Sequence, residues 1–256
     1  MIHFPKKRWG QNFLIDPNIL RKIHHSIGIQ AGEIIIEIGP GKGALTQLLI
    51  GSGAEIHAVE IDPDLIPDLQ ARFENSDNFI LHYADALKFD FSRFGRKLRI
   101  VGNIPYNITS PLLFRLFEFN EFIFDIHFLV QKELGKRITA LPNSRDYGIL
   151  GVLSHYYGSP KILFDVSPQV FRPVPRVISS EISIRIDPLV TDKGFHQQYH
   201  LVVKTAFGKR RKTMTNSLEE LLPADRSGCP LDLGRRPETL SPEEFIALTK
   251  WLFPAG

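Results

Sequence analysis

Short β-rich runs alternate with helical patterns over the first 187 residues, and this alternation limits the fold more than any other feature. Strands are predicted at 34–38, 55–60, 79–83, 98–101, 122–130, 161–166 and 180–186. One helix is predicted before the first strand, at 17–26. Further helices are predicted between the strands, at 44–50, 63–73, 111–117 and 132–141. Since parallel strands need long crossover connections, usually helices, the pattern predicts an α/β fold with a parallel sheet.

The pattern changes towards the C-terminus. The last two predicted strands are close enough to pair antiparallel, and the proline-rich stretch 167–177 between them is predicted to be an extended loop. After Asp187-Pro188 only helices are predicted, at 195–207, 213–222 and 242–252. The expected organisation is therefore a Rossmann-like domain over residues 1–187 and a small helical domain over 188–256.

Composition excludes several classes of protein. The 256 residues are 43% hydrophobic and 23% charged, which excludes a wholly disordered or fibrous chain. The one cysteine, Cys229, can form neither an internal disulfide nor a zinc cage, so a reducing compartment is expected. We find no secretory signal and no apolar stretch of membrane-spanning length. The sequence predicts a soluble, cytoplasmic protein.

A metal site is not predicted. His196 and His200 have i, i+4 spacing, which suits a metal ion, but Gln197 stands where a zinc-protease motif has glutamate. No third ligand is nearby in the sequence.

A glycine-rich loop joins the first predicted strand to a helix and predicts a nucleoside cofactor. Gly39 and Gly41 permit a tight turn that lets a ligand approach the backbone. Glu60 ends the next strand, where a carboxylate can accept both hydroxyls of a ribose. The loop also satisfies the dinucleotide fingerprint, because Ala44 is allowed at its last position. Asp85, after the third strand, can accept a hydrogen bond from an adenine amino group or cap the following turn, and the three loop ends together favour S-adenosylmethionine.

The segment Asn103-Ile104-Pro105-Tyr106 after the fourth strand carries the chemical signal. Methylation of an exocyclic amine requires its nitrogen lone pair to be aimed at the methyl group. The Asn103 side-chain oxygen and the Ile104 carbonyl can accept the two N–H groups and favour that geometry. Pro105 restricts the chain and has no N–H, and Tyr106 offers a face on which a base can stack. Phe171 is either a second stacking face or an ordinary core side chain.

Positive charge is concentrated in the predicted helical domain. No acidic residue lies between Lys193 and Leu218, whereas six basic residues do, which exceeds the net charge of +3 of the whole chain. Such a cluster is typical of phosphate-backbone binding, although a charged run can also be a solvated helix face. The run Lys209, Arg210, Arg211 and Lys212 is the predicted RNA contact, and a smaller cluster contains Lys6, Lys7 and Arg8.

These motifs together resemble the ribosomal RNA small-subunit adenine N6,N6-dimethyltransferases, the KsgA/RsmA family, over nearly the whole chain. The segments that carry the resemblance are 7–14, 37–46, 59–62, 85–86, 103–107, 131–133, 171–177, 207–218 and 236–240. Family members usually have leucine at Ile104, phenylalanine at Trp9 and often leucine at Met214. None of these departures changes a functional group.

The resemblance implies a class I methyltransferase fold: a Rossmann-like, seven-stranded sheet with an antiparallel terminal hairpin, plus a helical C-terminal domain. It implies methyl transfer from S-adenosylmethionine to N6 of two adjacent adenosines in the 3′-terminal hairpin of 16S rRNA, in small-subunit biogenesis. A monomer is expected. The cofactor contacts implied are Gln11, Asn12, Leu14, Gly39, Gly41, Glu60, Ile61, Asp85, Ala86 and Asn103.

Three other functions compete with this one. A large-subunit rRNA adenine methylase would share the same pocket, but the C-terminal helical domain and its Arg236-Pro237-Glu238 segment favour the small-subunit enzyme. A nucleic-acid-binding factor that has lost catalysis, as in the related mitochondrial transcription factors, is disfavoured by the intact 103–106 segment. A nicotinamide-dependent oxidoreductase would leave that segment unexplained.

Overall fold

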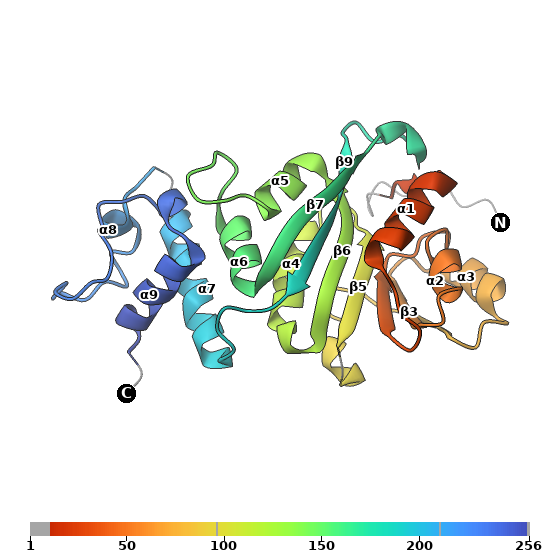
Figure 1. Ribbon diagram of the computed structural model, residues 1–256, viewed down its shortest axis with the longest axis horizontal. Helices are drawn as coiled ribbons and strands as arrows, with labels where there is room; N and C mark the ends of the chain where they lie inside the picture. Colours follow the sequence, from red (N-terminus) through yellow and green to blue (C-terminus); the bar gives the residue numbers. More distant parts are fainter. Residues whose placement is uncertain (1–10, 96, 210, 255–256) are drawn as a thin grey trace. The chain divides into compact units, whose positions relative to one another are not determined.

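A computed structural model describes residues 11–95, 97–209 and 211–254. Its centre is a seven-stranded sheet in the order β4-β3-β2-β5-β6-β9-β7 (Figure 1). The strands are β2 (Ile34–Ile38), β3 (Glu55–Glu60), β4 (Phe79–Tyr83), β5 (Leu98–Asn103), β6 (Ile123–Gln131), β7 (Gly158–Val166) and β9 (Ser179–Ile186). The seven-stranded α/β fold that the sequence and its resemblance indicated is confirmed.

Strand pairing follows the predicted alternation. The parallel part of the sheet runs from β4 through β3, β2 and β5 to β6. β9 then pairs antiparallel with β6. All five residues of β2 are buried, as expected for a central parallel strand covered on both faces. The strand order reverses direction at β2 and β5, which is where ligands bind in open sheets of this type.

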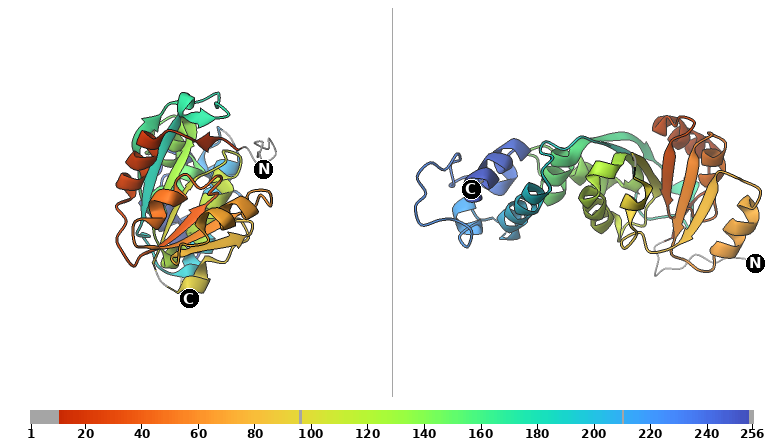
Figure 2. Two further views of the ribbon diagram at one scale, coloured as in Figure 1. Left: turned by 90° about the vertical axis from the view of Figure 1, so that its right-hand side faces the viewer. Right: turned by 90° about the horizontal axis from the view of Figure 1, so that it is seen from below.

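Helices cover both faces of the sheet because the sheet extends from β2 on both sides, through β3 to β4 and through β5 to β6. Right-handed crossovers then place α2 (Thr46–Ile50) and α3 (Ile66–Phe73) on one face and α4 (Thr109–Glu118) on the other (Figure 2). The helix α1 (Pro17–Ile27) begins at Asp16, whose side chain accepts hydrogen bonds from two backbone N–H groups in its first turn. Its buried side chains join one hydrophobic cluster with residues of β2, β3, β5 and β6.

Arg99 anchors the C-terminal end of α1. Its guanidinium donates to the carbonyls of Ile27 (2.5 Å) and Gly28 (3.2 Å), which end the helix. It also pairs with both carboxylate oxygens of Asp125 on β6, at 2.9 and 2.6 Å. A cation at a helix C-terminus interacts favourably with the helix dipole.

The proline-rich stretch differs in part from the predicted extended loop. It begins with the 3₁₀ turn η4 (Pro168–Val170), and Phe171–Arg172 forms the strand β8. β8 pairs antiparallel with β1 (Phe13–Leu14), which the sequence pattern did not predict. Two-residue strands carry too little periodicity to be recognised, and their pairing depends on segments far apart in the chain.

Contacts divide the chain into two compact units. One holds the described residues up to Gly135 together with Lys161–Ile186, and the other holds Lys136–Pro160 together with the residues from Asp187 onwards. The second unit therefore includes 136–160, which the sequence analysis places in the first domain. The reason is the helix α6 (Ile149–Tyr157), which the pattern did not reveal because most of its residues are apolar and seven of the nine are buried.

The second unit has an aromatic core. Tyr156 of α6 stacks on Tyr199 of α7 (Lys193–Gly208), with ring centroids 3.9 Å apart. Two further helices, α8 (Met214–Ser217) and α9 (Pro242–Leu252), complete it, and α9 begins at Ser241 with a capping box. α8 is shorter than the helix predicted over 213–222. No helix among the described residues is long and apolar enough to cross a membrane.

Remaining elements of the fold are short. The helix α5 (Lys132–Ile138) follows β6, and the 3₁₀ turns are η2 (Phe91–Phe94), η3 (Asn120–Phe122) and η5 (Pro237–Thr239).

Candidate functional site

A cavity of about 510 Å³ lies in the first unit, where β2, β3 and β5 end. That volume is in the range of small-molecule and cofactor sites. The lining residues include every predicted cofactor contact, from Gln11, Asn12 and Leu14 through Gly39, Gly41, Glu60, Ile61, Asp85 and Ala86 to Asn103. Ile104, Pro105 and Tyr106 also line it. The structure therefore brings together segments that are up to 95 residues apart.

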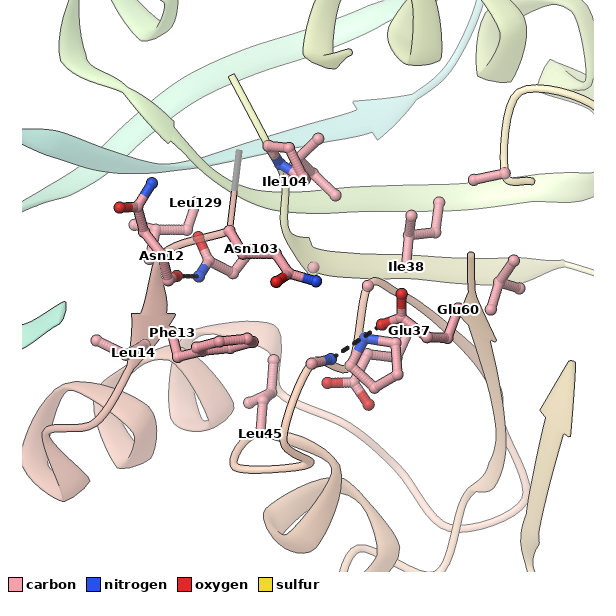
Figure 3. A pocket seen from close by; sticks show the side chains of 18 of the residues that line it. Asn12, Phe13, Leu14, Glu37, Ile38, Leu45, Glu60, Asn103, Ile104 and Leu129 are labelled. Carbon is pink, nitrogen blue, oxygen red and sulfur yellow. Dashed lines mark hydrogen bonds between the residues drawn. The ribbon is translucent and has the colours of Figure 1, made fainter. Parts of the chain in front are cut away.

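The turn after β2 has the geometry that its glycines predicted. Gly39 and Gly41 have φ of 69° and 57°, in the left-handed region that favours glycine. A Cβ on Gly41 would lie 3.0 Å from the Phe13 ring, so a larger residue there would crowd the cavity wall. The Gly41 backbone N–H donates to Glu60 at 3.3 Å (Figure 3).

Glu60 is held at the end of β3 by backbone hydrogen bonds. Its Oε1 accepts from the N–H groups of Ile61 (2.9 Å) and Asp62 (2.8 Å). Burial raises the pKa of Glu60, and the hydrogen bonds from Asp62, Gly41 and Ile61 oppose that rise. Each carboxylate oxygen has two lone pairs, and Oε1 uses both, so one lone pair of Oε2 remains to accept a hydrogen bond from a ribose hydroxyl.

Two further carboxyls support or line this wall. Glu37 on β2 accepts a hydrogen bond of 2.6 Å from the Thr46 hydroxyl, and burial raises its pKa to about 7. Asp85 Oδ1 accepts from the Leu87 backbone N–H at 2.9 Å, so this carboxylate both caps the turn after β4 and lines the cavity. The two roles proposed for Asp85 from sequence are compatible, because its other oxygen is separate from the cap.

Asn103 is joined to the N-terminal segment. Its side-chain Nδ2 donates to the Asn12 backbone carbonyl at 2.8 Å, and Figure 3 shows the Asn103 side chain pointing toward the Asn12 backbone. With the amide nitrogen used in this way, the Asn103 side-chain oxygen remains as the group that can accept from a ligand. The structure thereby orients the atom to which the sequence analysis assigned the chemistry.

Tyr106 is anchored to a strand that is far away in the sequence. Its hydroxyl forms a hydrogen bond of 3.1 Å with the Ser179 hydroxyl at the start of β9. The Pro105 carbonyl accepts from the Thr109 hydroxyl at 3.2 Å, which ties the segment to the first turn of α4. Both contacts limit the freedom of the segment, as a stacking surface and an amine-binding turn require.

Phe171 does not take the position predicted for a second stacking face. It is 1% exposed and belongs to the hydrophobic cluster that contains Leu14, Leu20 and Leu129. It is absent from the residues that line the cavity. In this structure Phe171 is a core side chain, because β8 pairs with β1 and the ring packs into the cluster, and its closure over a bound base stays a prediction.

Comparison with known proteins identifies the family. The model of the ribosomal RNA adenine dimethylase family matches residues 2–252. The chain belongs to this family. It is 44% identical over 259 residues to the ribosomal RNA small subunit methyltransferase A of Saccharophagus degradans, covering 98% of this chain and 96% of that protein. It is 45% identical over 254 residues to the protein of the same name from Aromatoleum aromaticum, covering 98% and 95%.

Solved structures support the fold of this dimethylase family member. A dimethyladenosine transferase from Plasmodium falciparum has a TM-score of 0.78 at 22% identity, covering 92% of this chain and 95% of that chain. The 23S rRNA methyltransferase ErmE has a TM-score of 0.71 at 24% identity, covering 94% and 99%. The likeness extends over both compact units.

Several residues of the dimethylase cavity were not predicted from the sequence. Phe13, His127, Leu129 and Glu181 all line it. Phe13 stands between the predicted contacts Asn12 and Leu14, so its position in the sequence could have indicated that it lines the cavity. The sequence around Glu181 predicts exposure. Glu181, Ser183 and Arg185 alternate with isoleucines along β9, a pattern that predicts a solvent-facing side. Instead β9 lies between β6 and β7, inside the sheet, and Glu181 is 1% exposed.

The basic run of the dimethylase lies in the second unit. Lys209, Arg211 and Lys212 are exposed and, with Arg145, line a cavity of about 530 Å³. Arg145 is a cation that the sequence analysis did not include. Arg210, and the cluster Lys6, Lys7 and Arg8, lie outside the described residues. The four described cations gather on one surface, as phosphate binding requires.

The histidines with metal-like spacing serve structural contacts. His196 Nε2 lies 2.8 Å from the Val190 carbonyl, and His200 Nε2 lies 2.9 Å from the Tyr157 hydroxyl. No group of three potential metal ligands occurs within residues 11–95, 97–209 and 211–254.

Proposed function

We propose that this protein dimethylates N6 of two adjacent adenosines in the 3′-terminal hairpin of 16S rRNA, with S-adenosylmethionine as methyl donor, during small-subunit biogenesis. One observation carries the proposal: the Asn103–Tyr106 segment lines the same cavity as Glu60 and Asp85. An amine-binding turn and a nucleoside-binding wall are thus adjacent. The names of the relatives at 44% and 45% identity support the choice of small-subunit rRNA.

The cavity suits the cofactor. We assign a ribose hydroxyl to Glu60, the adenine amino group to Asp85 and the methionine end to the segment Gln11–Leu14, which Asn103 holds. The backbone of Gly39 and Gly41 allows close approach of the ligand. The bound cofactor supplies an electrophilic methyl group on a positively charged sulfur.

The acceptor amine is oriented by the chain itself. The Asn103 side-chain oxygen and the Ile104 carbonyl accept the two N–H groups, so the nitrogen lone pair is released from conjugation with the ring. Tyr106, anchored by Ser179, supports the base by stacking. No strongly basic side chain is needed, because the amine becomes acidic only as it is methylated. Since Phe171 is buried, stacking on the second face is not assigned to it.

The helical part after residue 187 is proposed to hold the RNA. The exposed cations Lys209, Arg211 and Lys212, together with Arg145 of the same unit, offer contacts to phosphates but do not select a base. Selection of the adenosine then belongs to the first unit. We also propose that the enzyme is cytoplasmic and acts as a monomer. Sedimentation of the purified protein would test the oligomeric state.

Methylation of purified ribosomal subunits tests the function directly. Undermethylated small subunits and large subunits are incubated with the protein and labelled S-adenosylmethionine, and the modified adenosines are mapped. We expect label on two adjacent adenosines of 16S rRNA and none on large subunits. Label confined to large-subunit RNA would instead support the other adenine methylase activity. Tight cofactor binding without methylation of either subunit would support a binding factor.

A further inference from the structure

A buried carboxyl group lines the cavity and has no role in the proposed chemistry. Glu181 on β9 is 1% exposed, and both of its carboxyl oxygens are buried without a hydrogen-bond partner within the described residues. The side chain nevertheless lines the cofactor cavity. Because an unsatisfied buried polar group is costly, a ligand or water must compensate it in the working enzyme.

The sheet register gives the position of Glu181. Asn103 on β5 is the register partner of Leu129 on β6, which is in turn the partner of Glu181 on β9. Register partners share a face of the sheet, and two strand spacings separate the Asn103 and Glu181 backbones by about 10 Å. Glu60 lies two strands away on the other side of Asn103. Glu181 is therefore at the reaction end of the cavity, away from the proposed ribose wall.

Apolar side chains and one histidine line the same cavity as this carboxyl. β1 contributes Leu14 and α1 contributes Leu20 and Ile23 to the same cavity. From β6, His127 lines the cavity, and its Nδ1 has no hydrogen-bond partner in the described structure. On the same face of β6, Asp125 pairs with Arg99 at 2.6 Å and lies 3.3 Å from His127, and Arg185 of β9 lies over the Phe124 ring.

Other titratable groups are farther along the fold or on the other face. The α1 residue His24 has a buried Nε2 without a partner, and burial lowers its pKa, so it is not a counter-cation. On β7, Asp165 accepts from Ser180, whose side chain is on the opposite face from Glu181. The cationic cavity residues Lys42 and Arg72 belong to the glycine turn and to α3.

Burial alone raises the pKa of Glu181 to about 8, so the carboxyl is mainly neutral at pH 7. A cation bound nearby would favour the ionised form. The methyl donor carries a positive sulfur, whereas the demethylated product, S-adenosylhomocysteine, carries a neutral thioether. The cofactor and the product therefore differ in the charge that Glu181 can sense.

We propose that Glu181 is a selectivity residue that releases its proton to solvent when S-adenosylmethionine binds, and thereby favours the methyl donor over S-adenosylhomocysteine. The proposal rests on the placement of the cofactor given under Proposed function. The direction of the pH dependence follows from linkage. Bound donor lowers the pKa of Glu181, so the ratio of donor to product affinity increases as pH rises through that lowered pKa. A fall of one pKa unit corresponds to roughly tenfold tighter binding of the donor.

Calorimetry on the full-length, cofactor-free protein measures this directly. S-adenosylmethionine and S-adenosylhomocysteine are each titrated at pH 7 in buffers of different ionisation enthalpy, which yields the number of protons released per ligand. The proteins are wild type, Glu181→Gln, and Glu74→Gln as a matched control on an exposed carboxyl. Titration of Glu37 and of the ligands' own amino groups is common to all three proteins and cancels in the comparison.

We expect wild type and Glu74→Gln to release more protons with the donor than with the product, and Glu181→Gln to lose most of that excess. The ratio of donor to product affinity should rise between pH 6 and 9 by several-fold more in wild type than in Glu181→Gln. Equal proton release by the donor in wild type and Glu181→Gln would overturn the inference. So would the absence of any donor excess in wild type.

Two results separate this inference from the proposed function. If wild type binds neither ligand, the assigned cofactor site is wrong. If it binds both tightly with proton release unaffected by Glu181→Gln, only the role of Glu181 is wrong. Should Glu181→Gln not fold, Glu181→Leu suits the apolar surroundings and provides the same comparison.

Discussion

Replacement of Asn103 separates orientation of the amine from support of the cofactor segment. Its Nδ2 donates to the Asn12 carbonyl at 2.8 Å, and its other amide atom is available to the substrate. Loss of the hydrogen bond from Asn103 Nδ2 to the Asn12 carbonyl costs about 0.5–1.5 kcal/mol, which corresponds to roughly 2- to 13-fold weaker cofactor binding. Asn103→Ala also removes the acceptor for the amine, so we expect its single-turnover rate to fall by at least about a hundredfold even at saturating cofactor.

Asn103→Asp tests the same reasoning with an isosteric side chain. An ionised Asp at this position keeps the acceptor oxygens but directs a carboxylate at the Asn12 carbonyl, so cofactor binding weakens. When protonated it can donate again, so affinity should recover as the pH is lowered through its pKa. Cofactor affinity by calorimetry and single-turnover methylation of undermethylated small subunits measure both effects, with exposed Asn75→Asp as control. A near-wild-type rate for Asn103→Ala at saturating cofactor would refute the assigned role.

Three further predictions address the cofactor wall, the anchored helix and the basic run. Glu60→Ala and Asp85→Ala should each weaken cofactor binding by roughly ten- to a hundredfold without unfolding the protein, since each removes a charged hydrogen-bond acceptor; calorimetry showing wild-type affinity in both would exclude them from the site. Arg99→Met should lower the free energy of unfolding by about 3–5 kcal/mol in urea titrations, because it leaves Asp125 charged, buried and unpaired by Arg99. Burial raises the pKa of Asp125, but hydrogen bonds from His127 and Arg99 outweigh it and the pKa is lowered, so the stability from this pair is present above about pH 4 and is lost as pH falls through the folded pKa; an unchanged deficit at acid pH would contradict this account. Neutralising residues 209–212 should weaken RNA binding and flatten its salt dependence by about 0.7–0.9 per lost phosphate contact while cofactor affinity stays intact, and an unchanged salt slope would mean that the run is only a solvated surface.

Local sequence patterns were sufficient wherever one segment determines its own structure. The predicted bounds of β2, β3, β4 and α9 coincide with those observed, because strands and helices with clear periodicity and capping residues form without distant information. The same is true of the glycine turn. Prediction was weaker where periodicity is faint, as in α6, where seven of nine residues are buried.

The candidate site was predictable to the extent that its residues stand at strand ends. Parallel strands place their carboxyl ends at one edge of the sheet, so Gly39, Glu60, Asp85 and Asn103 had to converge once the alternation was recognised. The resemblance added the N-terminal contacts, which no periodicity indicates. The role of Phe171 stayed open at the level of sequence, because an aromatic residue in a proline-rich stretch can face either a ligand or the core.

The sequence by itself determined the alternation of strands and helices, the edge of the sheet where ligands bind, and the chemistry of its loops. Only the tertiary structure decided which side chains of β8 and β9 turn inward. A period-two pattern shows that two faces differ, but not which face is covered. Phe171 is buried because β8 pairs with β1, and Glu181 is buried in the cavity because β9 lies between β6 and β7 and helices cover both faces. These pairings join residues at least 48 positions apart, so the physical environment of each side chain exists only after the sheet has formed.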